Sequence, residues 1–259
     1  MTDQHAPAGY IAPGQRLGRV RMPAGQNVAG YPVGILYIDQ VHYPMMPGNV
    51  VNAWTYDFPV RMRAVGGLTS GQLFCADGSI VDDLIEGARA LQREGVRAIT
   101  GACGFFGNYQ REVAAAVSIP VAMSSLIQVP WIRAVLPGRR IGVLTANGTA
   151  FSPALLEAVG VTDSSDLVVR GLGDAPEFSA ILEDRGEFDD SVVQEEVLEA
   201  ARALLQDAPD IGAILLECSD MPPYASAVQA ATGLPVFDFI TMIRWLRFAT
   251  QQMPYHGFI

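Results

Sequence analysis

Two segments of this chain match each other at a fixed separation of 115 residues, and this repeat restricts the fold more than any other feature. Cys103 ends one copy and Cys218 ends the other. The other matched pairs are Ala98 and Ala213, Ile99 and Ile214, Tyr109 and Tyr224, Val113 and Val228, Pro120 and Pro235, and Val121 and Val236. The repeat predicts two similar halves, each presenting one cysteine at an equivalent position.

Short apolar segments alternate with helical patterns after residue 31. The predicted strands cover 33–38, 59–65, 96–100, 120–123, 141–144, 167–170, 211–216 and 234–237. The predicted helices cover 82–93 with Ser79 as N-cap, 108–117, 126–135 with a break at Pro130, 153–159, 191–206, 222–231 and 240–250. Strands that are apolar throughout are typical of parallel sheets covered on both faces. We therefore expect an α/β fold of two pseudo-symmetric subdomains, each a parallel sheet flanked by helices, with the active site in the cleft between them.

The expected division places 32–136 and 238–259 in the first subdomain and 137–237 in the second. Residues 1–31 are polar and rich in glycine and proline, without a sustained period. They form either a disordered end or an arm that packs on a partner subunit. A homodimer is the common arrangement for such folds.

Composition narrows the function classes. The net charge of −10 and the pI near 4.7 argue against nucleic acid or an anionic membrane as partner. All 17 basic residues are arginine, so Schiff-base chemistry on a lysine is excluded. The three histidines, His5, His42 and His256, are scattered, which predicts no metal site. No secretory signal and no membrane span are apparent, so a cytoplasmic enzyme with free thiols and no cofactor is expected.

The cysteines differ in what their surroundings predict. Cys75 lies in an apolar context and is expected to be structural. Cys103 and Cys218 each follow a predicted strand and precede a predicted helix, where backbone N–H groups favour a thiolate and lower its pKa. Because ligands of open α/β folds bind beyond the carboxyl ends of the strands, both thiols should face one small molecule.

Two thiols without a cofactor can invert a stereocentre next to a carboxylate: one removes the α-proton and the other returns a proton to the opposite face. Polar side chains at the same strand ends are candidates for binding that carboxylate substrate. They are Ser124, Ser125, Thr145, Asn147, Thr149 and Ser219. Taken singly, each is equally explained as a turn or cap residue.

The two cysteine segments, Gly-Ala-Cys103-Gly-Phe-Phe and Leu-Glu-Cys218-Ser-Asp-Met, together with Ile-Gly-Val-Leu-Thr-Ala-Asn-Gly-Thr149, resemble the aspartate/glutamate racemase superfamily. That superfamily also includes hydantoin and allantoin racemases, maleate isomerase and arylmalonate decarboxylase. The resemblance implies cofactor-independent proton transfer between Cys103 and Cys218.

The chain departs from the amino-acid racemases beside both cysteines. Gly104 and Phe105 follow the first, and Ser219 and Asp220 follow the second. These four are candidate substrate-binding residues for a bulkier or more apolar substrate. Asp39 lies near the position of an acid in glutamate racemases and either assists Cys103 or belongs to a plain loop.

Three hypotheses follow. The first is a racemase or epimerase of an amino acid or a hydantoin-like compound that needs both thiols. The second is a decarboxylase or cis–trans isomerase that uses one cysteine. The third is a protein that binds a small acid without chemistry.

Overall fold

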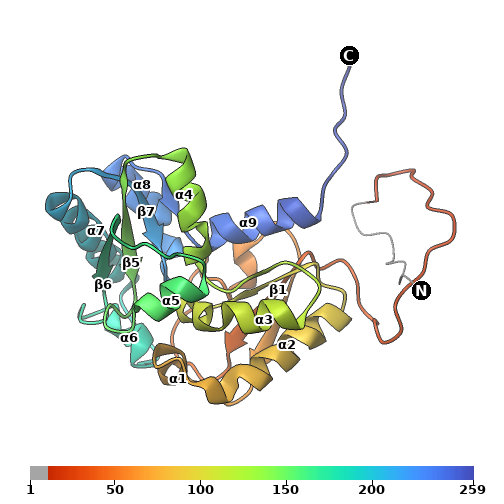
Figure 1. Cartoon of the computed structure of the whole chain (residues 1–259), viewed down its shortest axis with the longest axis horizontal. Coiled ribbons are helices and arrows are strands. Elements are labelled where there is room, and N and C mark those ends of the chain that lie inside the picture. The colour runs from red at the N-terminus through yellow and green to blue at the C-terminus, as the bar shows by residue number, and fades with distance from the viewer. Residues whose placement is uncertain (1–10) are drawn as a thin grey trace.

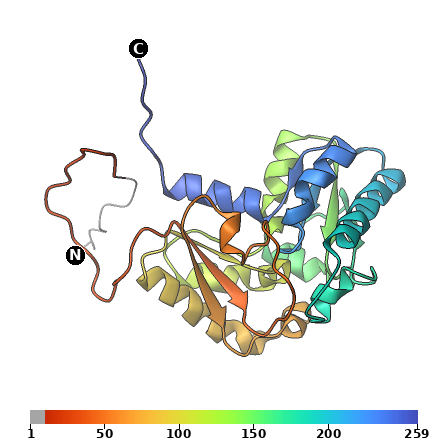
Figure 2. The ribbon, with the colours of Figure 1, turned by 180° about the vertical axis from the view of Figure 1, so that it is seen from behind.

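The computed structural model describes residues 11–259, and the first ten residues of the predicted arm lie outside the described part. Residues 11–32 contain no helix or strand and are mostly exposed. Figures 1 and 2 show this segment and the C-terminal tail running away from a two-lobed body. Among the described residues, none of the helices combines the length and the apolarity required to cross a bilayer.

Each lobe contains a four-stranded parallel sheet. The first sheet has the order β2-β1-β3-β4 and the second has the order β6-β5-β7-β8. The strands of the first are β1 (Val33–Ile38), β2 (Val60–Val65), β3 (Ala98–Gly101) and β4 (Val121–Ala122). Those of the second are β5 (Arg140–Thr145), β6 (Leu167–Gly171), β7 (Ile211–Leu216) and β8 (Val236–Phe237). The predicted α/β class with two parallel sheets is confirmed.

Helices cover both sheets (Figure 1). The α-helices are α1 (Ser70–Phe74), α2 (Val81–Arg93), α3 (Gln110–Ala116), α4 (Val129–Val135), α5 (Pro153–Ala158), α6 (Ser179–Leu182), α7 (Asp190–Asp207), α8 (Ala225–Thr232) and α9 (Phe239–Thr250). The 3₁₀ helices are η1 (Ala53–Thr55), η2 (Gly78–Ile80), η3 (Gly104–Tyr109), η4 (Ser125–Gln128) and η5 (Pro222–Tyr224). The 115-residue separation maps β4 onto β8 and the first residue of α3 onto that of α8, so the repeat in sequence is a repeat in structure.

The predicted elements differ from the observed ones mainly where a helix begins. Ser79 does not cap α2: the side chain of Asp77 accepts a hydrogen bond from the Ser79 N–H and starts η2 instead. Three predicted helices open with a 3₁₀ turn, which leaves Pro130 in the first turn of α4 rather than at a kink. A proline lacks the N–H that the first turn of a helix leaves unpaired, so it is tolerated there.

The buried apolar side chains of residues 11–259 form three clusters, one of which crosses between the two lobes. One cluster joins Leu36 and Ile99 of the first sheet to Val143 and Leu215 of the second. A second cluster packs α7 and α8 on the second sheet. In the third, Phe239 and Ile243 of α9 pack with Val33 and Ile35 of β1, so the last helix covers the first sheet. The cluster that crosses between the lobes thus includes residues of both central strands, Ile99 of β3 and Leu215 of β7.

Candidate active site

Cys103 and Cys218 both lie just past the carboxyl end of a central strand, Cys103 after β3 and Cys218 after β7. Cys218 is 5% exposed and Cys103 is partly buried. Both are free thiols, and each is close enough to the carboxylates of Glu217 and Asp220 for these charges to raise its pKa. The structure therefore places the two cysteines and two acids in one buried group at the junction of the lobes.

Glu217 enters this group from the end of β7. It is fully buried, and its Oε2 accepts a hydrogen bond from the hydroxyl of Thr145 over 2.8 Å. Its Oε1 has no hydrogen-bond partner among residues 11–259. A Cβ added to Gly104 would overlap this carboxylate, so a glycine is required next to Cys103. Burial raises the pKa of Glu217 to about 7, and the bond from Thr145 lowers it by less.

Asp220 is the second acid and the partner of Cys218. Its Oδ2 accepts hydrogen bonds from the thiol of Cys218 and the hydroxyl of Ser219, both over 3.4 Å. Its Oδ1 accepts a bond from the Tyr43 hydroxyl over 3.0 Å and another from the Asn49 amide. Burial raises the pKa of Asp220, although these four donors oppose the shift. The bonds fix the carboxylate beside the thiol.

The loop between β1 and β2 reaches from the first lobe to the second and covers this group. Tyr43 and Asn49 bind Asp220. The N–H of His42 donates to Asp184 over 3.0 Å, and the His42 carbonyl accepts from the N–H of Gly186 over 2.7 Å. Residues 42–49 therefore bridge the two lobes beside the thiols.

Burial reverses the predicted direction of the thiol pKa. The sequence predicts a lowered value at both cysteines, whereas loss of solvation raises the pKa of Cys103 and of Cys218. Backbone N–H groups do lower it, those of Phe105 and Phe106 at Cys103 and that of Asp220 at Cys218, but by less than burial and the neighbouring acids raise it. Both thiols are protonated at neutral pH in this arrangement.

The predicted hydroxyl set is used largely by the protein itself. Ser124 caps η4 by accepting from the Leu126 N–H, and the Ser125 hydroxyl donates to the Leu216 carbonyl over 3.0 Å. The side-chain oxygen of Asn147 accepts from the N–H of Thr149, which is exposed. Ser124 and Asn147 therefore hold local turns, Ser125 bonds to the other lobe, and Thr145 and Ser219 bind the acids.

Phe105 and Asp39 also take roles other than the expected ones. The ring of Phe105 packs edge-to-face on Phe74 in the core, with centroids 5.0 Å apart, so this residue contributes its backbone N–H rather than its ring. Asp39 is exposed in the loop after β1, and no hydrogen bond connects it to Cys103 in the described part of the chain. The position of Asp39 favours a role in the loop over a role in assisting Cys103.

Sequence reasoning missed Glu217, Tyr43 and Asn49. A signal was available for Glu217, because it is the single charged residue in the apolar segment 211–218 and directly precedes a candidate nucleophile. No comparable signal identifies Tyr43 and Asn49, which reach Asp220 across 177 and 171 residues of chain.

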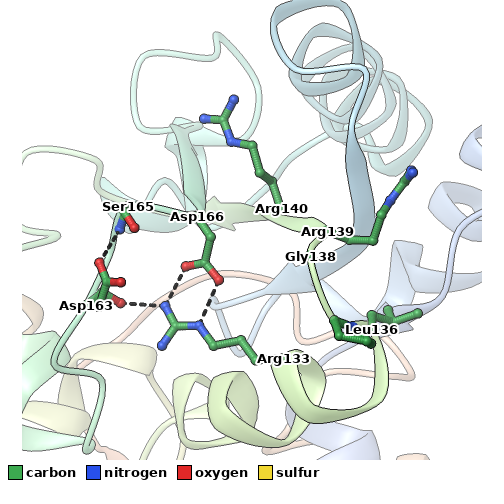
Figure 3. A pocket seen from close by; sticks show the side chains of 9 residues that line it. Arg133, Leu136, Gly138, Arg139, Arg140, Asp163, Ser165 and Asp166 are labelled. Carbon is green, nitrogen blue, oxygen red and sulfur yellow. Dashed lines mark hydrogen bonds and ion pairs between the residues drawn. The ribbon is translucent and has the colours of Figure 1, made fainter.

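A surface hollow elsewhere carries no such chemistry (Figure 3). Arg133, Arg139, Arg140, Asp163 and Asp166 contribute to its walls, and the guanidinium of Arg133 pairs with Asp166. Since Arg140 begins β5 and Asp166 directly precedes β6, the hollow lies at the amino ends of the strands. The cysteines lie at the opposite ends, so the hollow is unrelated to them.

Comparisons with known proteins agree with this architecture. The family model described as Asp/Glu/Hydantoin racemase matches residues 66–246. A dimethylsulfoniopropionate lyase of Durusdinium sp. clade D is 35% identical over 248 residues, covering 91% of this chain and 80% of its own length. Dimethylsulfoniopropionate lyase 3 of Emiliania huxleyi (strain CCMP1516) is 37% identical over 227 residues, covering 83% of this chain and 58% of its own.

Among solved structures, the allantoin racemase of Klebsiella pneumoniae superposes with a TM-score of 0.57 at 20% identity, over 87% of this chain and 91% of that one. At this identity the likeness concerns the fold alone. This chain is thus similar in sequence to proteins named as lyases and similar in fold to one named as a racemase.

Proposed function

The chain belongs to the Asp/Glu/hydantoin racemase family of enzymes, and we propose that within this family it is a lyase that cleaves a β-sulfonium carboxylate such as dimethylsulfoniopropionate. The observation that carries the proposal is a charge imbalance: Glu217 and Asp220 are grouped with the two thiols, and neither forms a salt bridge with any arginine of residues 11–259. Such a site suits a substrate that carries a positive charge. Aspartate and glutamate carry a net negative charge and would be repelled.

The identities of 35% and 37% to lyases that act on a sulfonium compound support the same substrate class. Elimination from such a compound begins as racemisation does, with removal of the proton next to the carboxylate. In the elimination the electron pair of that C–H bond forms a carbon–carbon double bond, and the carbon–sulfur bond breaks. The sulfonium leaves as neutral dimethyl sulfide, and acrylate remains.

Cys218 is the base in this proposal. Its thiol already donates to Asp220, which accepts the thiol proton, and the resulting thiolate removes the α-proton of the substrate. Because dimethyl sulfide leaves without needing a proton, one thiol suffices for the chemistry. Cys103 then lies on the opposite side of the substrate and contributes to its binding.

Purified protein incubated with dimethylsulfoniopropionate tests the proposal. Headspace gas chromatography should detect dimethyl sulfide, and the Cys218→Ser variant should produce none above the uncatalysed rate. A protein that releases no dimethyl sulfide from this substrate is not the proposed lyase.

The two-thiol racemase is a second candidate, favoured by the presence of a cysteine at the equivalent position of each lobe. It requires both thiols, one as base and one as acid. Amino acids and hydantoins incubated with the protein in D₂O distinguish it, because a racemase exchanges their α-proton for deuterium and interconverts the enantiomers.

A further inference from the structure

Glu217 is an unusual buried acid, because one of its two carboxylate oxygens accepts no hydrogen bond from residues 11–259. Its side chain is fully buried and Thr145 binds Oε2, whereas Oε1 has no hydrogen-bond partner in the described part of the chain. Desolvating a polar atom without a replacement hydrogen bond is unfavourable. A buried oxygen of this kind is explained if a group of a bound ligand contacts it.

Asp238 provides the contrast. It is also buried, at 5% exposure, yet its carboxylate accepts from the N–H of Thr241 and caps α9. The protein uses this acid to begin a helix, and neither of its oxygens is unpartnered and buried. Glu217 begins no helix and closes no turn, so its position is not explained by local structure.

The surroundings of Glu217 also lack a compensating charge. Burial raises the pKa of Glu217 and the hydrogen bond from Thr145 lowers it, and no cation in the part of the chain that the structure describes contributes to the shift. The acid neighbours of the same group, Asp220 and the two thiols, add negative charge on ionisation. Buried carboxylates are normally paired with a cation or bound to a metal.

Resting on the proposed function, we propose that Glu217 is the specificity-determining residue that binds the positive charge of the substrate, with its free Oε1 directed at the onium group. Gly104 keeps this oxygen next to Cys103 because it has no Cβ to displace the carboxylate. Thr145 holds the other oxygen from β5. The onium group then lies between the two lobes, beside Cys103, with the carboxylate end of the substrate directed away from Glu217.

Two non-reacting ligands isolate the charge. The zwitterion 3-(trimethylammonio)propionate and the anion 4,4-dimethylpentanoate have the same shape and the same carboxylate. They differ by one positive charge, which the first carries on its quaternary nitrogen. We would measure the binding of both by isothermal titration calorimetry at about pH 8, where Glu217 is ionised. The wild-type protein should bind the ammonium ligand at least ~10-fold more tightly than 4,4-dimethylpentanoate.

Glu217→Gln should reduce this preference at least ~10-fold and leave the affinity for 4,4-dimethylpentanoate within about threefold of the wild-type value. Glu157→Gln, at a glutamate whose side chain is 66% exposed, is the matched control and should retain the preference. A Glu217→Gln variant that retains the preference overturns the proposal, and so does a wild-type protein without one.

If Glu217→Gln fails to fold, the wild-type protein still gives a test. Its preference for the ammonium ligand should weaken as the pH falls from about 8 to about 6, because protonation of Glu217 removes the negative charge that faces the onium group. Burial keeps Cys103, Cys218 and Tyr43 protonated over this range. Burial also raises the pKa of Asp220, so the titration is repeated with Asp220→Asn, in which the weakening should persist because Glu217 is still present. An unchanged preference would overturn the proposal. The binding measurements test only the role of Glu217. If the wild-type protein releases no dimethyl sulfide, the proposed function is contradicted instead.

Discussion

Cys218 and Asp220 hydrogen-bond to each other in both directions. The thiol donates to Oδ2 over 3.4 Å, and the backbone N–H of Asp220 donates back to Sγ over 3.5 Å. Cys103 has no side-chain hydrogen bond to an acid in the described chain, although Glu217 lies close to it. The two lobes therefore present equivalent cysteines in unequal surroundings, and this inequality is the basis for assigning the base to Cys218.

Replacing Asp220 by asparagine should slow the reaction and make the thiol more acidic. The charge of Asp220 raises the pKa of Cys218, so its removal lowers that pKa. Alkylation of Cys218 by iodoacetamide, measured against pH in a Cys103→Ser background, should shift to lower pH. At the same time kcat should fall about 100-fold, because the proton acceptor is lost. A variant with normal kcat would show that Asp220 only positions the loop.

The stability of the protein should depend on pH through Glu217. Its pKa in the folded protein is about 7, against an ordinary value of 4.5. The folded state therefore binds more protons than the unfolded state between these values, and stability falls as the pH rises through this window. Relative to the wild type, Glu217→Gln should gain up to about 3 kcal/mol in unfolding free energy between pH ~4 and pH ~8. Urea denaturation at both pH values measures this, and a constant difference would contradict the raised pKa.

Gly104→Ala should damage the site more than a glycine substitution on the surface. The added Cβ overlaps the Glu217 carboxylate, so either that side chain or the Cys103 backbone must move. We expect a loss of activity of about 100-fold or more, since displacements of about 1 Å at a reacting group have effects of that size. Gly66→Ala, where a Cβ has no neighbour within 4 Å, is the control. Equal activities would show that the contact with Glu217 is unimportant.

The loop over the site should become more mobile when its bonds to Asp220 are removed. Tyr43→Phe removes the 3.0 Å bond and leaves the ring in place. Amide hydrogen exchange of residues 42–49 should then be faster, because local opening has one hydrogen bond fewer to break. Tyr109→Phe, which removes a hydroxyl that donates to the Asp77 carbonyl outside this group, is the control. If both variants exchange alike in this segment, the Tyr43 bond does not hold the loop.

The sequence was sufficient to predict the two parallel sheets and the position of each cysteine, because both depend on local apolar patterns and on the repeat. It was not sufficient for the electrostatics. Phe105 and Phe106 do offer N–H groups to Cys103, as expected of a helix start, but the burial that reverses the pKa shift depends on how the lobes pack. Tyr43 and Asn49 are similarly defined only by the tertiary contact with Asp220.

The predicted hydroxyl residues show the same limit. Ser125 does lie at the junction, yet its hydroxyl binds the carbonyl of Leu216 and holds the lobes together. A serine at a strand end is equally suited to a substrate and to the backbone of the facing lobe. Which of the two partners the serine binds depends on its distance from the facing lobe, and this distance cannot be predicted from the sequence.

The most direct test of the lyase assignment compares three proteins on one substrate. Wild type, Cys103→Ser and Cys218→Ser are each incubated with dimethylsulfoniopropionate, and dimethyl sulfide and acrylate are quantified together. The account predicts equal amounts of both products from the wild type, a loss of at least ~1,000-fold in Cys218→Ser, and a smaller loss, of about 10-fold, in Cys103→Ser. A wild-type protein that forms neither product, or one whose activity survives in Cys218→Ser, would contradict it.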